Sequence, residues 1–236
     1  MSWRVAVVAE LRDETDTART LALDIAGWSG HTAGQHVDVR LTAPDGYTAV
    51  RPYSIASGPG QQRVDLTVEI DPNGEVSPYL ARDVTVGEQL EIRGPLGGWF
   101  VWRPAQTEPV QLIAGGSGLV PLMSMLRARA ATDSSAPFRL LYSVRRPEAM
   151  LYADELIRAG KLEDVDVSLT YTREAPPGWP HPVGRLDAVR LEVETWPPSV
   201  APTTYICGPT AFVEAVADLL LAAGHEARRI RTERFG

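Results

Sequence analysis

Residues 51–57 carry side chains that could bind a flat cofactor bearing phosphate groups. They read Arg-Pro-Tyr-Ser-Ile-Ala-Ser. Arg51 offers forked donors that suit a phosphate, Tyr53 a flat aromatic face, and Ser54 a small hydrogen-bonding group. Because Pro52 cannot donate to a sheet ladder, we expect this strand to lie at the edge of its sheet. Taken alone, the stretch is explained equally well as an ordinary edge strand with an exposed arginine.

A glycine-rich loop follows an apolar strand further along the chain. Residues 115–121 read Gly-Gly-Ser-Gly-Leu-Val-Pro and lead into a predicted helix. Small residues allow a backbone to approach a diphosphate, and a helix N-terminus offers N–H groups and a favourable dipole. The loop lacks the Gly-Lys-Ser/Thr ending of a P-loop, and Pro121 stands at the last glycine of a strict G-x-G-x-x-G. The strand-to-helix context favours nucleotide binding over a purely steric turn.

Two shorter motifs could serve the same purpose. Gly74-Glu75-Val76-Ser77 could hold a second pair of phosphates, although alone it is better read as structure. Residues 207–209, Cys-Gly-Pro, follow a buried strand and open another helix. Ligands bind beyond the carboxyl ends of parallel strands, so this motif is a candidate for the nucleotide side. A lone cysteine there is more often a small buried apolar residue than a nucleophile.

Cations follow the next two predicted strands. Ser143, Arg145 and Arg146 end one, with Tyr152 just beyond, and Arg173 ends the next. Such cations could hold a phosphate on an adenosine ribose, whereas an acidic residue would suit a free ribose hydroxyl. Solvated loop charge is the alternative for any single arginine.

The totals exclude several classes of function. The 236 residues carry a net charge of −7, without the basic excess of a nucleic-acid-binding protein. Cys207 is the only cysteine, which excludes an internal disulfide and any all-cysteine zinc or iron–sulfur site. The four histidines show no paired spacing, so no metal site is expected. The first residues lack the long apolar core of a signal peptide and no apolar run is long enough to cross a bilayer, so we expect a cytoplasmic protein.

Short strands separated by turns dominate the first hundred residues. The predicted strands are 4–11, 18–25, 35–41, 50–56, 63–70 and 89–93, with a helix at 76–81. Six antiparallel strands of even spacing predict a small Greek-key β-barrel. Strands and helices alternate after residues 102–109. The predicted strands are 110–114, 138–144, 165–171, 203–207 and 227–232, and the predicted helices are 119–131, 149–159, 186–194 and 210–223. This alternation predicts a parallel, Rossmann-like sheet. We therefore expect a β-barrel domain at 1–104 and an α/β domain at 105–236.

These motifs together resemble the ferredoxin–NADP⁺ reductase-like flavoproteins over almost the whole chain. The motifs that carry the resemblance are Arg51-x-Tyr53-Ser54, Gly74-x-Val76-Ser77, the loop 115–121, Cys207-Gly208-Pro209 and the ending Glu233-Arg234-Phe235-Gly236. The resemblance implies an FAD-binding barrel and an NAD(P)-binding domain. It implies that Arg51 binds the flavin diphosphate, Tyr53 packs on the flavin, Ser54 lies near N5, Phe235 covers the other flavin face with Glu233 close by, and Cys207 borders the nicotinamide.

The expected site is larger than these few residues. Catalytic roles are expected for Ser54, Cys207, Glu233 and Phe235. Cofactor contacts are expected from Arg51, Pro52, Tyr53, Ser54, Thr67, Val68, Ile70, Gly74, Val76, Ser77, Gly116, Ser117, Gly118, Pro121, Ser143, Arg145, Arg146, Tyr152, Arg173, Cys207, Gly208, Pro209 and Phe235. The arginines favour NADPH, with NADH as the other possible coenzyme.

The resemblance implies hydride transfer from NADPH to flavin N5, followed by release of single electrons. With one cysteine and no iron–sulfur domain, we expect the acceptor on another polypeptide, a ferredoxin or similar carrier of an oxygenase system. Phe235 is followed by a glycine, unlike the final aromatic residue of plastid-type relatives. Two alternatives are open: a free flavin or ferric reductase, and a non-catalytic subunit that lends its flavin and nucleotide sites to a larger complex.

Overall fold

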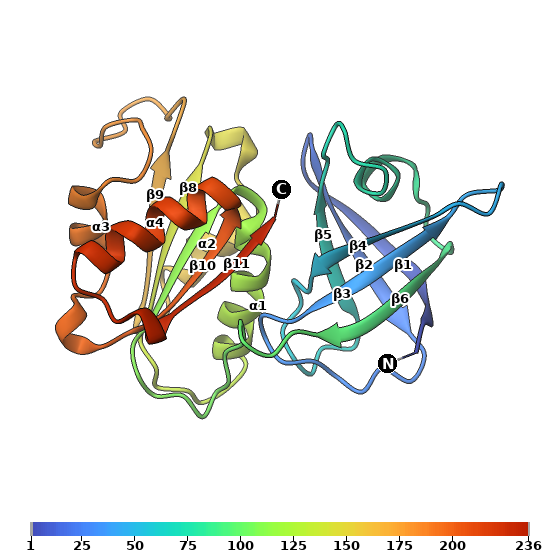
Figure 1. The fold of residues 1–236 in the computed structure, drawn as a ribbon, viewed down its shortest axis with the longest axis horizontal. Coiled ribbons are helices and arrows are strands. Elements are labelled where there is room, and N and C mark those ends of the chain that lie inside the picture. The colour runs from blue at the N-terminus through green and yellow to red at the C-terminus, as the bar shows by residue number, and fades with distance from the viewer. Residues whose placement is uncertain (1, 236) are drawn as a thin grey trace. The chain divides into compact units, whose positions relative to one another are not determined.

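The computed structural model describes residues 2–235, which form two compact units. The first unit comprises residues 1–103 together with 123–131, and the second comprises 104–122 and 132–236. The second half of one helix thus groups with the first unit. Figure 1 shows a sheet of six strands near the N-terminus and a sheet of five strands with helices near the C-terminus.

Six antiparallel strands build the first unit, as the sequence predicts. They are β1 (Arg4–Thr15), β2 (Ala18–Ile25), β3 (His36–Thr42), β4 (Thr48–Ser54), β5 (Val64–Glu69) and β6 (Gln89–Leu96), in the order β4-β3-β6-β1-β2-β5. The prediction of an edge strand is confirmed, because β4 stands first in this order. Pro52 lies opposite Asp38 of β3, its one neighbouring strand in the sheet.

The two ends of this sheet meet just after β4. The Ile55 N–H donates to Gln35 O at 2.9 Å, whereas the Ala56 N–H donates to Asp65 O at 2.8 Å. Ile55 also forms an isolated antiparallel bridge with Leu66 of β5. The chain therefore changes partners within two residues and closes the sheet into a barrel. The barrel interior is filled by buried apolar side chains, including Val8, Leu21, Val39, Leu66 and Ile92.

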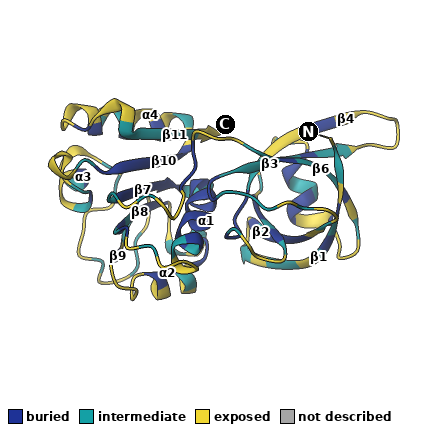
Figure 2. Ribbon diagram, turned by 90° about the horizontal axis from the view of Figure 1, so that it is seen from below, coloured by how far each residue is buried: buried dark blue, intermediate teal, exposed yellow. Residues whose placement is uncertain are grey.

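Five parallel strands build the second unit. They are β7 (Val110–Gly115), β8 (Phe138–Val144), β9 (Val165–Tyr171), β10 (Thr203–Pro209) and β11 (Ile230–Phe235), in the order β11-β10-β7-β8-β9. The chain begins in the middle at β7, moves outward to β8 and β9, and returns on the other side of β7 to form β10 and β11. The point where this direction reverses lies between β7 and β10, which is where open α/β sheets bind ligands. Both strands are buried (Figure 2).

Helices cover both faces of this sheet. They include α2 (Ala153–Ala159), α3 (Ala188–Glu194) and α4 (Thr210–Ala222), whereas α1 (Leu119–Ala130) begins in this unit and groups with the first unit from Met123 onward. Figure 2 shows α3 and α4 on one side and α2 on the other. Leu191 of α3 and Val213, Val216 and Leu220 of α4 pack on Ile113 of β7 in one buried cluster. Asp187 caps α3 by accepting from the Arg190 N–H at 2.8 Å.

Three predicted elements are wrong in their placement. The predicted helix 76–81 begins at residue 77 and continues as a π-type turn, Tyr79–Asp83; Pro78 itself has helical backbone angles, φ −60° and ψ −44°, because proline is tolerated in the first turn of a helix. The predicted helix 149–159 is a 3₁₀ turn, Pro147–Ala149, followed by α2. Tyr152 separates the two with a left-handed backbone, φ +53°, which a helix cannot contain.

The last strand is also displaced from its predicted position. The predicted strand 227–232 begins with a 3₁₀ turn, Ala227–Arg229, and β11 starts only at Ile230. As a result, Glu233 and Phe235 lie within the parallel sheet, and Gly236 lies outside the described residues.

Within residues 2–235, no helix is both long and apolar enough to cross a membrane. No group of three or more His, Cys, Asp or Glu side chains in the same range could hold a metal ion.

Candidate functional site

The edge strand β4 presents Arg51 and Tyr53 in different surroundings. Arg51 is exposed, whereas Tyr53 is half-buried and packs against the barrel core. Burial raises the pKa of the Tyr53 phenol, and the charge of Arg51 opposes that rise. Tyr53 therefore stays neutral at physiological pH and offers a fixed aromatic face. Ser54 ends the strand opposite His36 and is partly exposed.

The loop 71–77 lies beside this strand and is held by its own side chains. Ser77 Oγ accepts from the Asp71 N–H at 3.0 Å. A Cβ at Gly74 would lie 3.0 Å from Ser77 Oγ and 3.2 Å from Asp71 Cβ, so the loop leaves little room for a larger residue. The sequence did not single out Glu75, whose carboxylate lies 2.7 Å from the Arg51 guanidinium and so joins the loop to β4. Glu75 lies 24 residues from Arg51 in the sequence, so no local pattern could have revealed the pair.

Some expected flavin contacts can involve only the backbone. The side chains of Val68 and Val76 belong to the barrel core and are 0% exposed. Thr67 points to the other face, where its hydroxyl lies 2.7 Å from that of Thr20. Ile70 is partly buried against the core. Thr67 and Val68 are consecutive on β5, and because side chains alternate along a strand, theirs lie on opposite faces of the sheet.

Three side chains outside the predicted site fix the end of the stretch 51–57. Ser124 Oγ donates to Ser57 O at 2.7 Å, and Arg127 donates to Ala56 O at 2.8 Å. His31 Nε2 also lies 2.9 Å from Ser57 O. These partners lie 67, 71 and 26 residues from their acceptors, so no local pattern could have revealed them.

In the second unit, the loops after β7 and β10 interlock. A Cβ at Gly118 would lie 2.1 Å from Cys207 O and 2.6 Å from Gly208 N, so only glycine fits. A Cβ at Gly115 or Gly208 would lie 2.7 or 2.8 Å from the ring of Phe212, a residue that the sequence did not single out. Close packing between the two loops therefore accounts for the glycines at 115, 118 and 208, independently of any ligand.

The same interlocking brings the loop after β7 against the loop after β10. Gly116 has a left-handed φ of +55°, and Ser117 is partly exposed beside it. Pro121 lies buried in the first turn of α1. The expected nucleotide-binding backbone thus stands at the reversal point of the sheet and at the N-terminal end of a helix of 12 residues.

Cys207 and Glu233 are direct neighbours on β10 and β11. Cys207 pairs with Glu233 and Pro209 with Phe235, which is 40% exposed. Burial raises the pKa of the Cys207 thiol, and the Glu233 carboxylate raises it further. Cys207 therefore remains a protonated thiol at neutral pH and is unsuited to act as a nucleophile.

We expect Cys207 to react slowly with a thiol reagent in the folded protein. A raised pKa and a 1% exposed side chain both oppose attack, so alkylation by iodoacetamide at pH 7.5 should be more than about tenfold slower than in denaturant. The only cysteine of the chain makes mass spectrometry unambiguous. Equal rates in the two conditions would contradict a buried neutral thiol.

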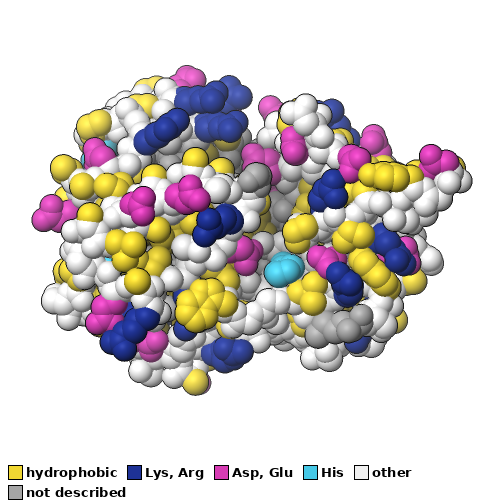
Figure 3. Space-filling view, viewed as in Figure 1, with side chains coloured by type: hydrophobic (Ala, Val, Ile, Leu, Met, Phe, Trp, Pro, Cys, Tyr) yellow, Lys and Arg dark blue, Asp and Glu magenta, His cyan; other side chains and the backbone are white. Residues whose placement is uncertain are grey.

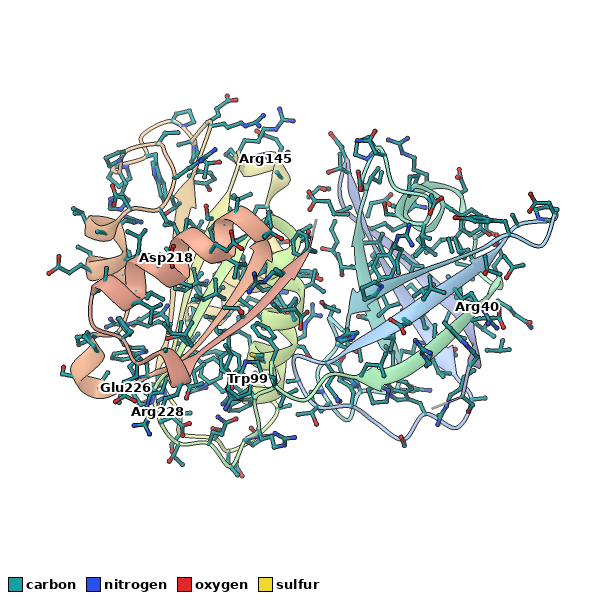
Figure 4. The ribbon with its side chains drawn as sticks, in the orientation of Figure 1. Arg40, Trp99, Arg145, Asp218, Glu226 and Arg228 are labelled. Atoms are coloured by element: carbon teal, nitrogen blue, oxygen red, sulfur yellow. The ribbon has the colours of Figure 1, made fainter. Side chains whose placement is uncertain are left out.

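The predicted cations gather beyond β8 and β9. Arg145, Arg146 and Arg173 are exposed, and the Arg173 N–H donates to Arg145 O at 3.0 Å, which brings the two loops together. Figure 4 shows Arg145 at the end of the unit opposite Glu226 and Arg228. Lys and Arg side chains gather at this end in Figure 3. Ser143 and Tyr152 are buried, at 5% and 7% exposure.

Comparison with known proteins agrees with this arrangement. A profile described as oxidoreductase FAD-binding domain matches residues 13–101, and one described as oxidoreductase NAD-binding domain matches residues 112–218. NADH-cytochrome b5 reductase 1 of Pyricularia oryzae is 31% identical over 212 residues, which cover 85% of this chain and 67% of that protein. The chain belongs to the ferredoxin–NADP⁺ reductase-like flavoproteins. The predicted family and its two-domain fold are thereby confirmed.

Other members of the reductase-like family match at similar levels. The ferredoxin–NAD(P)⁺ reductase component of the naphthalene 1,2-dioxygenase/salicylate 5-hydroxylase systems of a Ralstonia species is 29% identical, covering 92% of this chain and 66% of that one. The FAD/NAD-binding domain of nitric oxide dioxygenase from Vibrio cholerae superposes with a TM-score of 0.86 at 25% identity, covering 99% and 98% of the two chains. The chain spans about half to two thirds of the length of the first curated relatives, from 52% to 66%.

Proposed function

We propose that this flavoprotein is an FAD-dependent NAD(P)H oxidoreductase that passes electrons to a separate acceptor. The observation that carries the proposal is that one chain contains two groups of residues suited to bind phosphate. One is the exposed Arg51 beside the loop 71–77, and the other is the glycine loop at the reversal point between β7 and β10. Bound FAD would supply the chemistry, by accepting two electrons as hydride and releasing them singly.

The residues of the chain fit the flavin half of this proposal. Arg51 offers guanidinium donors to the diphosphate, and the neutral Tyr53 offers its flat face to the ring system. The partly exposed Ser54 offers a hydroxyl at the end of the same strand. Backbone groups of residues 67–70 and 74–77 complete the proposed contacts, since Val68 and Val76 point into the barrel.

The nucleotide half uses the loops of the parallel sheet. Backbone N–H groups of Gly116, Ser117 and Gly118 are proposed to bind the coenzyme diphosphate. Cys207, Gly208 and Pro209 would border the nicotinamide, where the small neutral thiol leaves space for a planar ring. Glu233, paired with Cys207, and the exposed Phe235 complete this edge, and we propose that Glu233 supplies protons near the reacting atoms.

NADPH is the proposed coenzyme because Arg145, Arg146 and Arg173 gather where a 2′-phosphate would bind. NADH is the second candidate. Glu148 follows in the same loop. Burial raises the pKa of Tyr171 at the end of β9 and the Glu148 charge raises it further, so a carboxylate is also available for a ribose hydroxyl.

We propose a ferredoxin or similar one-electron carrier, within an oxygenase system, as the acceptor. The support is that relatives such as the glycine betaine monooxygenase reductase subunit of Chromohalobacter salexigens are named as reductases of oxygenases. A free flavin reductase, with flavin as an exchanging substrate, is the second candidate function. The ion pair between Arg51 and Glu75 favours it, because that pair competes with flavin phosphate.

Anaerobic titration of the purified chain with NADPH tests the proposal. A yellow protein whose flavin absorbance near 450 nm bleaches at about one equivalent of NADPH would support a resident FAD. Colourless protein that reduces only added flavin would support the second candidate. Absence of both flavin binding and NAD(P)H oxidation would overturn the proposal.

We expect Ser54→Ala to slow flavin reduction while leaving FAD bound. Loss of one neutral hydrogen bond near the reacting nitrogen should lower the single-turnover rate about threefold to tenfold. Stopped-flow absorbance gives the rate, and the FAD content of the purified variant gives the binding. Thr48→Ala removes an exposed hydroxyl from the start of the same strand and serves as the control. An unchanged rate in Ser54→Ala would exclude this role.

A further inference from the structure

Two of the five N–H groups of the Arg51 guanidinium are engaged within the first unit. One terminal nitrogen of the guanidinium donates to Glu75 Oε2 at 2.7 Å, and the other donates to the carbonyl of Val50 at 2.8 Å. A guanidinium that binds a phosphate bidentately uses two of its N–H groups side by side. A flavin diphosphate bound at Arg51 would therefore share the guanidinium with the Glu75 carboxylate or displace it.

Glu75 is held in place from a second side. Its other carboxylate oxygen accepts the Tyr47 hydroxyl at 2.9 Å, and this contact raises the pKa of the Tyr47 phenol. One carboxylate thus joins the β3–β4 hairpin, strand β4 and the loop 71–77. Its two oxygens take up donors much as two oxygens of a phosphate group would.

The pair is exposed enough to exchange. The side chains of Arg51 and Glu75 are 48% and 50% exposed, and ion pairs this exposed contribute little to stability. A diphosphate can therefore displace the carboxylate, but Glu75 remains in the same short loop. Its negative charge then faces the charge of the incoming diphosphate, and this repulsion persists at distances of a few ångströms.

We propose that Glu75 is an internal competitor for Arg51 that sets how tightly this chain holds phosphate-bearing flavins. The inference rests on the proposed flavin-binding function of Arg51. Flavin leaves more readily from a site whose cation has an alternative anionic partner. Glu75 thereby shifts the chain from a permanently loaded flavoprotein toward one that exchanges its flavin.

Titration of apoprotein with FAD, followed by flavin fluorescence, tests the proposal. Glu75→Gln keeps the size of the side chain and removes its charge, and we expect the Kd for FAD to fall about threefold to tenfold. Asp83→Asn makes the same change in net charge at an exposed residue beyond the loop and should leave the Kd unchanged. A Kd for Glu75→Gln equal to that of wild type would overturn the proposal. A higher Kd would also overturn it, because it would show that Glu75 positions Arg51 for flavin.

Ionic strength separates competition from a structural role. Salt screens exposed charges, so the gain from Glu75→Gln should shrink between about 0.05 M and about 0.5 M salt. A gain that is independent of salt would contradict the electrostatic cause. In an Arg51→Gln background, the gain should also be smaller, because there is no cation to release. Wild type that binds no FAD would contradict the proposed function, whereas equal binding by wild type and Glu75→Gln would contradict only the role of Glu75.

Discussion

Gly118→Ala should disrupt the second unit more than any other single methyl group added to its loops. The new Cβ would lie 2.1 Å from Cys207 O and 2.3 Å from Cys207 C, and both atoms belong to a backbone fixed within the buried strand β10. Overpacking of this kind costs about 1–3 kcal/mol, and more where the neighbour cannot move. We expect a lower melting temperature and much weaker coenzyme binding, because the loops after β7 and β10 must separate.

Thermal melting and coenzyme titration of the variant measure both effects. Gly184→Ala is the matched control, because it lies in the same unit with nothing within 4 Å of its Cβ. Flavin binding should persist in Gly118→Ala, since Arg51 and its loop belong to the first unit. A melting temperature equal to that of Gly184→Ala would show that the two loops separate at little cost.

Replacing both Arg145 and Arg146 by alanine should remove a preference for NADPH. Each charge-assisted hydrogen bond to a phosphate contributes about 1.5–3 kcal/mol, so kcat/KM for NADPH should fall about a hundredfold or more. The value for NADH should change only slightly, because NADH has no 2′-phosphate. The ratio of the two kcat/KM values is the measurement.

Arg158→Ala controls for the loss of an exposed arginine from the nearby helix α2. It should leave the coenzyme ratio unchanged. Two results would show that the arginines do not bind a 2′-phosphate. One is a wild type that already favours NADH, and the other is a double variant in which kcat/KM falls equally for both coenzymes. Glu148 would then become the residue to test for contact with a ribose hydroxyl.

The architecture could be predicted because it is encoded in patterns that repeat along the chain. Alternating apolar residues predicted the barrel strands, and apolar strands followed by glycine predicted the parallel sheet. Pro52 alone indicated an edge strand, and the structure confirms that position. Each of these signals lies within a few residues of its consequence.

Details that depend on contacts between distant residues could not be predicted. The bonds from Ser124 and Arg127 to the carbonyls of residues 56 and 57 join segments far apart in the sequence. The start of α2 was misplaced because the left-handed backbone of Tyr152 has no sequence signature. The ion pair of Arg51 with Glu75 spans 24 residues, and only the folded loop brings its two charges together.

The placement of residues 123–131 has a consequence for dissecting this chain by truncation. These residues follow the glycine loop of the second unit, yet they group with the barrel and donate to the buried carbonyls of Ala56 and Ser57. A fragment that stops near residue 104 would lack those donors, so that Ala56 O would lose Arg127 and Ser57 O would keep only His31, directly after strand β4. The first unit is therefore discontinuous in sequence, and its last segment is synthesised only after the first strand and the glycine loop of the other sheet.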